Sequence, residues 1–119
     1  MRDLFVSALS NAASSVAVVT TSGEAGMAGS TISSFCSVSA DPPMLLACVH
    51  KLSPLADTIK VNGHFCLNLL NQQQARESDV FAGRINTQQG DKFSLVDWTK
   101  SDAGQPRISE SLASFDCTV

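Results

Sequence analysis

Residues 25 to 43, AGMAGSTISSFCSVSADPP, carry a row of hydroxyl side chains among apolar ones. Thr31, Ser33 and Ser34 stand beside Ile32 and Phe35, a mixture typical of neither a wholly buried strand nor a flexible linker. Hydroxyl and backbone groups can satisfy a polar ligand without introducing charge. Most Ser and Thr side chains instead bond to neighbouring backbone or to water. Taken alone, the segment favours this second, structural role.

A second group of polar residues occurs where an expected strand meets an expected helix, in HKLSP at residues 50–54. Ser53 followed by Pro54 is typical of a helix N-terminus, because serine is a preferred N-cap residue and proline is well tolerated at the first helical position. Helix N-termini bind anions through unpaired N–H groups and the helix dipole. Ser53, Lys51 and the adjacent His50 are therefore candidates for binding a phosphate. The alternative is a capping serine beside a solvated lysine, which contributes about 1 kcal/mol to helix stability.

A third group lies in FAGR, residues 81–84, and in the later GDKF, which contains Lys92. Ala82 and Gly83 would let the backbone approach a flat ring closely, and Phe81 would supply an apolar wall. A helix C-cap with a core phenylalanine explains the same letters, and both interpretations can hold together. Lys92 is a further candidate, although a single lysine in a polar loop is usually exposed. For Arg84 the sequence leaves two partners open, Asp79 or a phosphate.

Other kinds of chemistry have little support in the sequence. Its four cysteines, Cys36, Cys48, Cys66 and Cys117, show no C-x-x-C spacing and lie in apolar or strand-like runs. We expect buried, reduced thiols and a cytoplasmic protein. The chain has no Walker loop and no G-x-G-x-x-G, and no acid–base pair of side chains is evident.

Composition excludes several classes of protein. The 119 residues are 44% hydrophobic and 16% charged, which is typical of one globular domain spanning 1–119. A net charge of −3 argues against nucleic-acid and anionic-membrane partners, because both require clustered Lys and Arg. No apolar run approaches the roughly 18 residues of a membrane span. An anionic ligand would have to be held by local donors.

The hydrophobic pattern predicts about five strands and two or three short helices. An amphipathic helix is expected near the N-terminus, with Leu4, Phe5, Ala8, Leu9 and Ala12 on one face. Further helices should run from Ser53 to Gly63 and from Asn71, as N-cap, to Gly83. Strands are expected at 15–21, 28–40, 44–50, 64–70 and 112–119, and the strand at 44–50 should be buried. The stretch 85–106 is expected to be loop with little regular structure.

These elements predict a mostly β fold, an antiparallel, Greek-key-like split barrel with short helical inserts. A doubly wound parallel sheet would need crossover helices between the first three strands, and none is expected there. The last strand stops in mid-alternation at Val119. We therefore expect a domain that is incomplete at its C-terminus, and the alternative is a natural end on an edge strand.

The order of motifs resembles the flavin reductase-like family, whose fold is the FMN-binding split barrel. The stretches that match are VAVVTT, GSTISSFCSVSADPPMLLACV, SPLADTIKVNGHFCLNLL, FAGR and GDKF. The resemblance implies that Thr31, Ile32, Ser33 and Ser34 line a flavin and that the 50–54 segment contacts its phosphate or ribityl chain. It also implies a homodimer. Relatives continue into further strands with a GDH motif, and the histidine of this motif is associated with the nicotinamide. This sequence lacks the motif, so the resemblance assigns none of its residues to the nicotinamide side of the site.

The resemblance implies an NAD(P)H-dependent flavin reductase that supplies reduced FMN or FAD to a partner monooxygenase. Hydride would pass from the nicotinamide of NADH or NADPH to the flavin, so the chemistry belongs to the two cofactors. One alternative is a non-reductase module that binds flavin or heme, or an oxidase acting on a small amine. A second alternative is an inactive fragment with a structural role.

Overall fold

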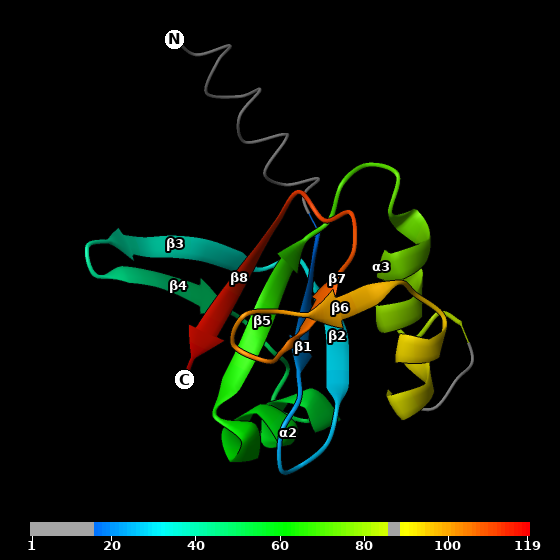
Figure 1. Cartoon of the computed structure of the whole chain (residues 1–119), viewed down its shortest axis with the longest axis horizontal. Coiled ribbons are helices and arrows are strands. Elements are labelled where there is room, and N and C mark those ends of the chain that lie inside the picture. Colours follow the sequence, from blue (N-terminus) through cyan, green and yellow to red (C-terminus); the bar gives the residue numbers. More distant parts are fainter. Residues whose placement is uncertain (1–15, 86–88) are drawn as a thin grey trace, which may run out of the picture.

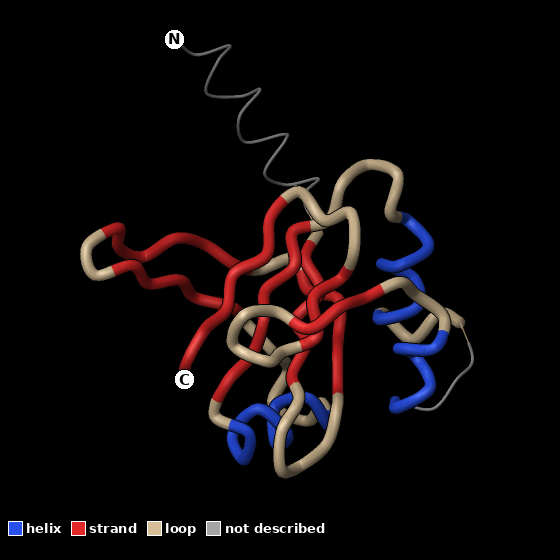
Figure 2. Tube along the Cα trace, viewed as in Figure 1, coloured by secondary structure: helices blue, strands red, loops and turns tan. Residues whose placement is uncertain are grey.

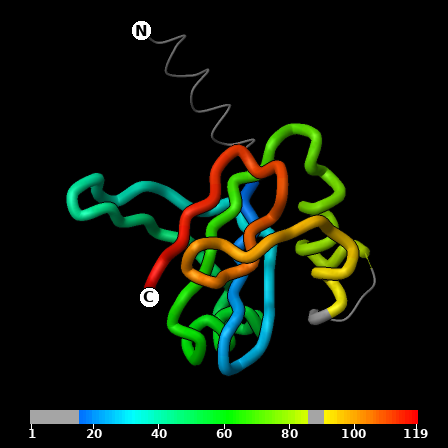
Figure 3. The backbone as a smooth tube through the Cα atoms, viewed as in Figure 1, coloured from blue at the N-terminus to red at the C-terminus, as the bar shows by residue number. Residues whose placement is uncertain are grey.

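The computed structural model describes residues 16–85 and 89–119, so the helix expected near the N-terminus lies outside the described residues. At the centre is a four-stranded antiparallel sheet (Figure 1) with the strand order β2-β1-β5-β8. Its strands are β1 (Ala17–Thr21), β2 (Ala28–Ile32), β5 (His64–Leu69) and β8 (Ala113–Thr118). Figure 3 shows the C-terminal strand, in red, running beside β5, in green. The expected mostly β, antiparallel fold is confirmed.

Strand β1 is buried along its whole length, because both faces of the sheet are covered. Its alternate residues point to opposite faces, so Ala17 and Val19 belong to one core cluster and Val18 to another. The first cluster also contains Leu55, the buried residue of helix α2 (Pro54–Asn62). Helix α2 has Ser53 as its N-cap and ends at Gly63, which has a positive φ of 76°, as the sequence predicts.

Several short elements cover the second face of the sheet. They are helix α3 (Ala75–Phe81), the 3₁₀ helix η1 (Gln89–Ser94), and the two-stranded hairpin of β6 (Trp98–Lys100) and β7 (Pro106–Ile108). Phe81, Phe93 and Ile108 come from three of these elements and are buried together with Val18. Regular structure in this region contradicts the expected loop at 85–106. Strands β6 and β7 have only three residues each and lie among polar residues, so the hydrophobic pattern of the sequence did not predict them.

Asn68 links four strands inside the second core. Its side-chain amide donates to the carbonyl of Val18 at 3.0 Å and to the hydroxyl of Thr20 at 3.1 Å. Its Oδ1 accepts from the backbone N–H of Ile108 at 2.9 Å and from the hydroxyl of Ser114 at 3.0 Å. The residue is fully buried and its hydrogen-bonding groups are satisfied, as a buried amide requires. It therefore ties β7 to the central sheet.

A separate hairpin of β3 (Phe35–Ala40) and β4 (Pro43–Ala47) extends away from the central sheet, as Figure 2 shows. A turn at 41–42 joins its strands, and the Asp41–Pro42 peptide bond is cis. Leu45 and Ala47 pack against the first core cluster, whereas Met44 and Leu46 on the other face are 55% and 53% exposed. The prediction of a buried strand at 44–50 is therefore wrong.

The prediction of one strand over 28–40 is also wrong. Strand β2 ends at Ile32 and β3 begins at Phe35, and the two belong to different sheets. Ser33 and Ser34 lie between them, where the chain leaves the central sheet for the hairpin. Strand propensity cannot show this change of sheet, because β-branched and apolar residues continue on both sides.

Two further expectations are corrected. Asn71 is not the N-cap of α3, because the helix begins at Ala75 after Gln74. The Asn71 side chain instead accepts from the N–H of Gln73 and donates to the carbonyl of Glu110.

All four cysteines are free, but only Cys66 is buried, and Cys36 and Cys48 are exposed on and beside the hairpin. Within the described ranges no helix has the length and apolar character needed to cross a membrane.

Candidate functional site

The hydroxyl row divides over the two faces of β2, which is an edge strand of the central sheet. Thr31 pairs with Val18 and lies on the α3 side, where its hydroxyl donates to the carbonyl of Ser78 at 2.7 Å. Ile32 pairs with Ala17 and is buried against Leu55 on the α2 side. Thr31 thus uses its one donor proton to fix helix α3 against β2 and retains only acceptor capacity.

Ser33 and Ser34 are the exposed members of the row. Neither hydroxyl has a hydrogen-bond partner among the described residues, whereas the carbonyl of Ser34 accepts from the N–H of Cys48 at 2.9 Å. This bond holds the segment after β4 beside the end of β2. Both side chains are consequently available to a ligand at this point of the chain.

The turn formed by residues 50–53 lies near the same end of β2, because Leu55 at the start of α2 packs with Ile32. Within this turn the Ser53 hydroxyl accepts from the N–H of Leu55 at 3.2 Å, and His50 Nδ1 accepts from the N–H of Leu52 at 3.1 Å. His50 and Lys51 are exposed. The capping role expected of Ser53 is confirmed, and the structure leaves its phosphate role a prediction.

On the opposite face of β2, Phe81 is buried in the core. Its side chain is 1% exposed, and its ring lies so close to Gly29 that a Cβ added there would be 2.7 Å from it. The ring of Phe93 meets it edge-on at 5.1 Å between centroids. The side chain expected to form an apolar wall beside a ligand is therefore enclosed by the fold. Ala82 and Gly83 are exposed, and Gly83 has a φ of 78°.

Lys92 is a buried cation on this face. Its side chain is 9% exposed, and no hydrogen bond or ion pair to another described residue satisfies its ammonium group. Burial lowers the pKa of Lys92, because desolvation disfavours the charged form. The neighbouring Phe93 packs edge-on against Trp98, whose indole N–H donates to the Phe93 carbonyl at 3.1 Å. A largely buried lysine that has no anionic partner among the described residues is a favourable environment for an anionic ligand.

The structure thus brings the predicted residues into two groups on either side of β2. The α2-side group contains Ile32, His50, Lys51 and Ser53, the α3-side group contains Thr31, Phe81, Ala82, Gly83 and Lys92, and Ser33 and Ser34 follow the end of the strand. The sequence left the partner of Arg84 open, and the structure pairs it with Asp79. In the described part of the chain, no cluster of three His, Cys, Asp or Glu side chains is placed to hold a metal ion.

A groove of about 1070 Å³ lies apart from both groups, and sequence reasoning did not predict it. It runs between the β3–β4 hairpin and the faces of β5 and β8, and its walls include Leu45, Leu67 and Phe115. The alternation of β8 in the sequence was the available signal, because it places Phe115 and Cys117 on one face of this edge strand.

Comparison with known proteins defines the class. The family model of the flavin reductase like domain matches residues 9–119, and the chain belongs to this family. The FMN reductase (NADH) RutF of Enterobacter cloacae is 36% identical over 118 residues, which are 99% of this chain and 71% of that protein. RutF 1 of Methylorubrum extorquens, also an FMN reductase (NADH), is 36% identical over 97% of this chain and 56% of its own length.

Solved structures agree with this assignment. Nitrilotriacetate monooxygenase component B from Mycobacterium thermoresistibile superposes with a TM-score of 0.79 at 36% identity, covering 98% of this chain and 64% of that one. The NADH:FAD oxidoreductase SgcE6 of Streptomyces globisporus, solved with NAD and FAD fragments, gives a TM-score of 0.79 at 28% identity over 99% and 70% of the two chains. The resemblance inferred from the sequence is confirmed.

Proposed function

We propose that this protein is an NADH-dependent flavin reductase that acts on FMN and supplies the reduced flavin to a partner monooxygenase. Family membership supports the reaction class, and the names of the relatives support FMN and NADH. Component B of a nitrilotriacetate monooxygenase among the similar structures supports the partner. The free thiols agree with a cytoplasmic location.

The structural observation that supports the proposal most directly is a pair of exposed hydroxyls at the end of an edge strand, neither of which has a hydrogen-bond partner among the described residues. Ser33 and Ser34 lie where the 50–53 turn and the segment after β4 converge on β2. A flavin presents carbonyl groups, ring nitrogens and ribityl hydroxyls, which these hydroxyls and the nearby backbone can satisfy without charge. Ile32, although buried, orients this turn by anchoring β2 to α2.

The α3-side group suits a ligand that is flat and also anionic. The exposed residues Ala82 and Gly83 permit close approach of a ring, and Lys92 forms no ion pair with a described residue. When bound together, the flavin accepts hydride from the reduced nicotinamide. The chain's own residues bind and orient, and no acid–base pair is required of them.

We also propose that the protein is a homodimer, in keeping with the resemblance. The outward face of the β3–β4 hairpin exposes Val38, Met44 and Leu46, each by more than half of its side chain. Two-stranded hairpins are marginally stable by themselves, so a covering surface would stabilise this one. A second copy of the chain provides such a surface.

The reaction is tested by anaerobic NADH oxidation at 340 nm with FMN, FAD or no flavin, on this 119-residue chain. We expect oxidation only when flavin is present, and faster with FMN. The double variant Ser33→Ala, Ser34→Ala should raise the Kd for FMN about tenfold, because two hydrogen bonds to the ligand are lost. Flavin binding without NADH oxidation would contradict the reductase and support a flavin-binding module. A chain that ignores both flavins would contradict the proposal as a whole.

A further inference from the structure

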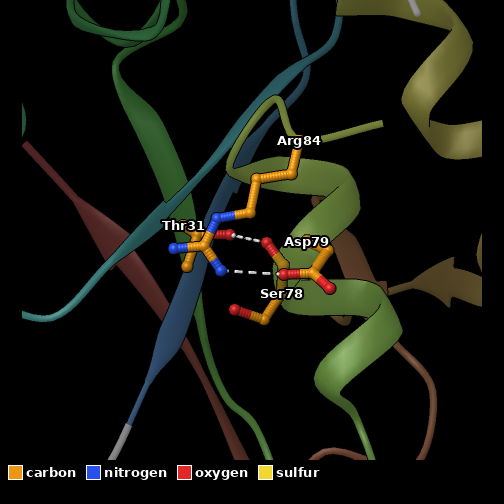
Figure 4. A network of polar contacts seen from close by, with 4 residues as sticks. All are labelled: Thr31, Ser78, Asp79 and Arg84. Carbon is orange, nitrogen blue, oxygen red and sulfur yellow. Dashed lines mark hydrogen bonds and ion pairs between the residues drawn. The ribbon is translucent and has the colours of Figure 1, made fainter. Parts of the chain in front are cut away.

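Arg84 and Asp79 form an ion pair where helix α3 meets strand β2. The Nη1 of Arg84 donates to Oδ1 of Asp79 at 2.9 Å, and this is the one ion pair between described residues. Asp79 follows Ser78, whose carbonyl accepts the hydroxyl of Thr31. Figure 4 shows these four residues gathered at the C-terminal end of α3, with the Arg84 side chain folded back toward β2. The pair therefore adjoins the α3-side group of the candidate site.

The backbone around Arg84 is held in place by hydrogen bonds to the last turn of α3. The N–H of Arg84 donates to the carbonyl of Asp79 at 3.0 Å, and that of Gly83 donates to Val80 at 3.3 Å. The positive φ of Gly83 turns the chain so that Arg84 lies back over the helix. Since Thr31 anchors the same helical turn to β2, the point from which the guanidinium extends is fixed relative to the hydroxyl row.

The guanidinium itself remains open to a second anion. The Arg84 side chain is 73% exposed and that of Asp79 is 43% exposed, so the pair is largely solvated. Exposed pairs of this kind contribute little to stability. A guanidinium has five N–H donors, and this contact uses one of them, which leaves an edge suited to a bidentate phosphate.

Other exposed cations are less suitable. Arg76, at the other end of α3, donates its guanidinium to the carbonyl of Leu95. Arg107 lies on β7, in the small hairpin with β6 that is separate from the central sheet. Because the chain carries a net charge of −3, a phosphate needs a local cation, and Arg84 is an exposed one beside this part of the site.

We propose that Arg84 binds the phosphate of the flavin nucleotide, and that Asp79 is the carboxylate that holds the guanidinium until the phosphate replaces it. The inference rests on the proposed function and adds to it a residue that distinguishes FMN from riboflavin. Asp79 lowers the affinity for phosphate, because its negative charge lies next to the group that binds it. Arg84 thereby determines which form of flavin the protein prefers.

The test is a titration of FMN and of riboflavin, which lacks the phosphate, into the wild-type chain and its variants without NADH. Emission of Trp98, the single tryptophan of the sequence, and of the flavin reports binding. Arg84→Gln should raise the Kd for FMN about tenfold and leave that for riboflavin unchanged. Arg84→Lys should have an intermediate effect, because the charge remains without the planar fork. Asp79→Asn should lower the Kd for FMN about threefold.

Arg107→Gln, which removes an exposed arginine on β7, is the matched control and should change neither Kd. Far-UV circular dichroism establishes that each variant is folded. Equal weakening of FMN and riboflavin by Arg84→Gln would overturn the inference, because the effect would then be structural. A higher KM for NADH with an unchanged Kd for FMN would overturn it as well, since the phosphate recognised would belong to the dinucleotide. In both cases the proposed reductase stands, whereas failure of the wild-type chain to bind any flavin overturns both.

Discussion

Lys92 illustrates how a single residue can favour ligand binding at the expense of stability. Its side chain is 9% exposed and forms no ion pair with a described residue, and burial lowers its pKa. A cation in this environment destabilises the folded protein unless a ligand supplies the opposite charge. Residues with a shifted pKa are typical of functional sites, and such residues often reduce the stability of the folded protein.

Replacing Lys92 with Met should therefore separate the two effects. We expect an unchanged or higher midpoint of urea unfolding, because the buried charge is removed and the aliphatic stem is retained. The Kd for FMN should rise about tenfold, because a charged partner of the ligand is lost. Urea titration and flavin titration of the same preparation measure both. A variant that is less stable and binds FMN normally would contradict this role for Lys92.

The stability of the wild-type chain should also depend on pH through Lys92. A lysine whose pKa is lowered on folding binds fewer protons in the folded state than in the unfolded state. Stability contributed by this group therefore increases as the pH rises through the lowered pKa toward the ordinary value of lysine. This increase should be absent from the Lys92→Met variant when unfolding midpoints are compared from neutral to alkaline pH.

At the scale of elements, the β6–β7 hairpin depends on a polar contact more than on its length. Its strands have three residues each, and the buried amide of Asn68 accepts the backbone N–H of Ile108. Thr20 supports the same strand by donating its hydroxyl to the carbonyl of Pro106 at 2.5 Å. The hairpin packs Trp98 against Phe93, so it also positions η1, which contains Lys92.

Asn68→Ala should lower the free energy of unfolding by about 3 kcal/mol, because it removes the acceptor of the buried N–H of Ile108 and of the Ser114 hydroxyl, together with the bonds that the amide donates to Val18 and Thr20. Urea unfolding followed by Trp98 fluorescence measures the loss. Ser114→Ala is the matched control, since it removes one partner of Asn68 and should cost about 1 kcal/mol. Equal losses for the two variants would show that Asn68 does not link the four strands.

At the scale of the whole molecule, the β3–β4 hairpin and the adjoining groove leave a large apolar surface without a cover in the described chain. Exposed apolar surface of this extent usually marks an interaction site. Met44→Glu with Leu46→Glu should convert the proposed dimer to monomer, because two charges would be desolvated at the interface. Light scattering coupled to size-exclusion chromatography measures the mass. Leu112→Glu, at an exposed leucine outside the hairpin, is the control and should leave the dimer intact.

The sequence by itself determined the elements whose signals are local. The start of α2 follows from Ser53 and Pro54, its end from Gly63, and β1, β5 and β8 from apolar runs or alternation of five or six residues. The family followed from motifs in a specific order, and with it the class of fold. Helix caps and side-chain periodicity are set by residues that are close together in the sequence, so these elements can be predicted without knowing which distant segments pack against them.

Tertiary structure decided the features that depend on partners far apart in the chain. The residues of β4 are apolar enough for a core strand, but in the described chain β4 pairs only with β3 in a hairpin that leaves Met44 and Leu46 exposed. Thr31 and Ile32 are adjacent, yet the pleat of β2 directs one to α3 and the other to α2. Phe81 is enclosed because Gly29, 52 positions earlier, lets its ring approach the strand. The burial of a residue depends on which segments pack against it, and the local sequence does not show which distant segments these are.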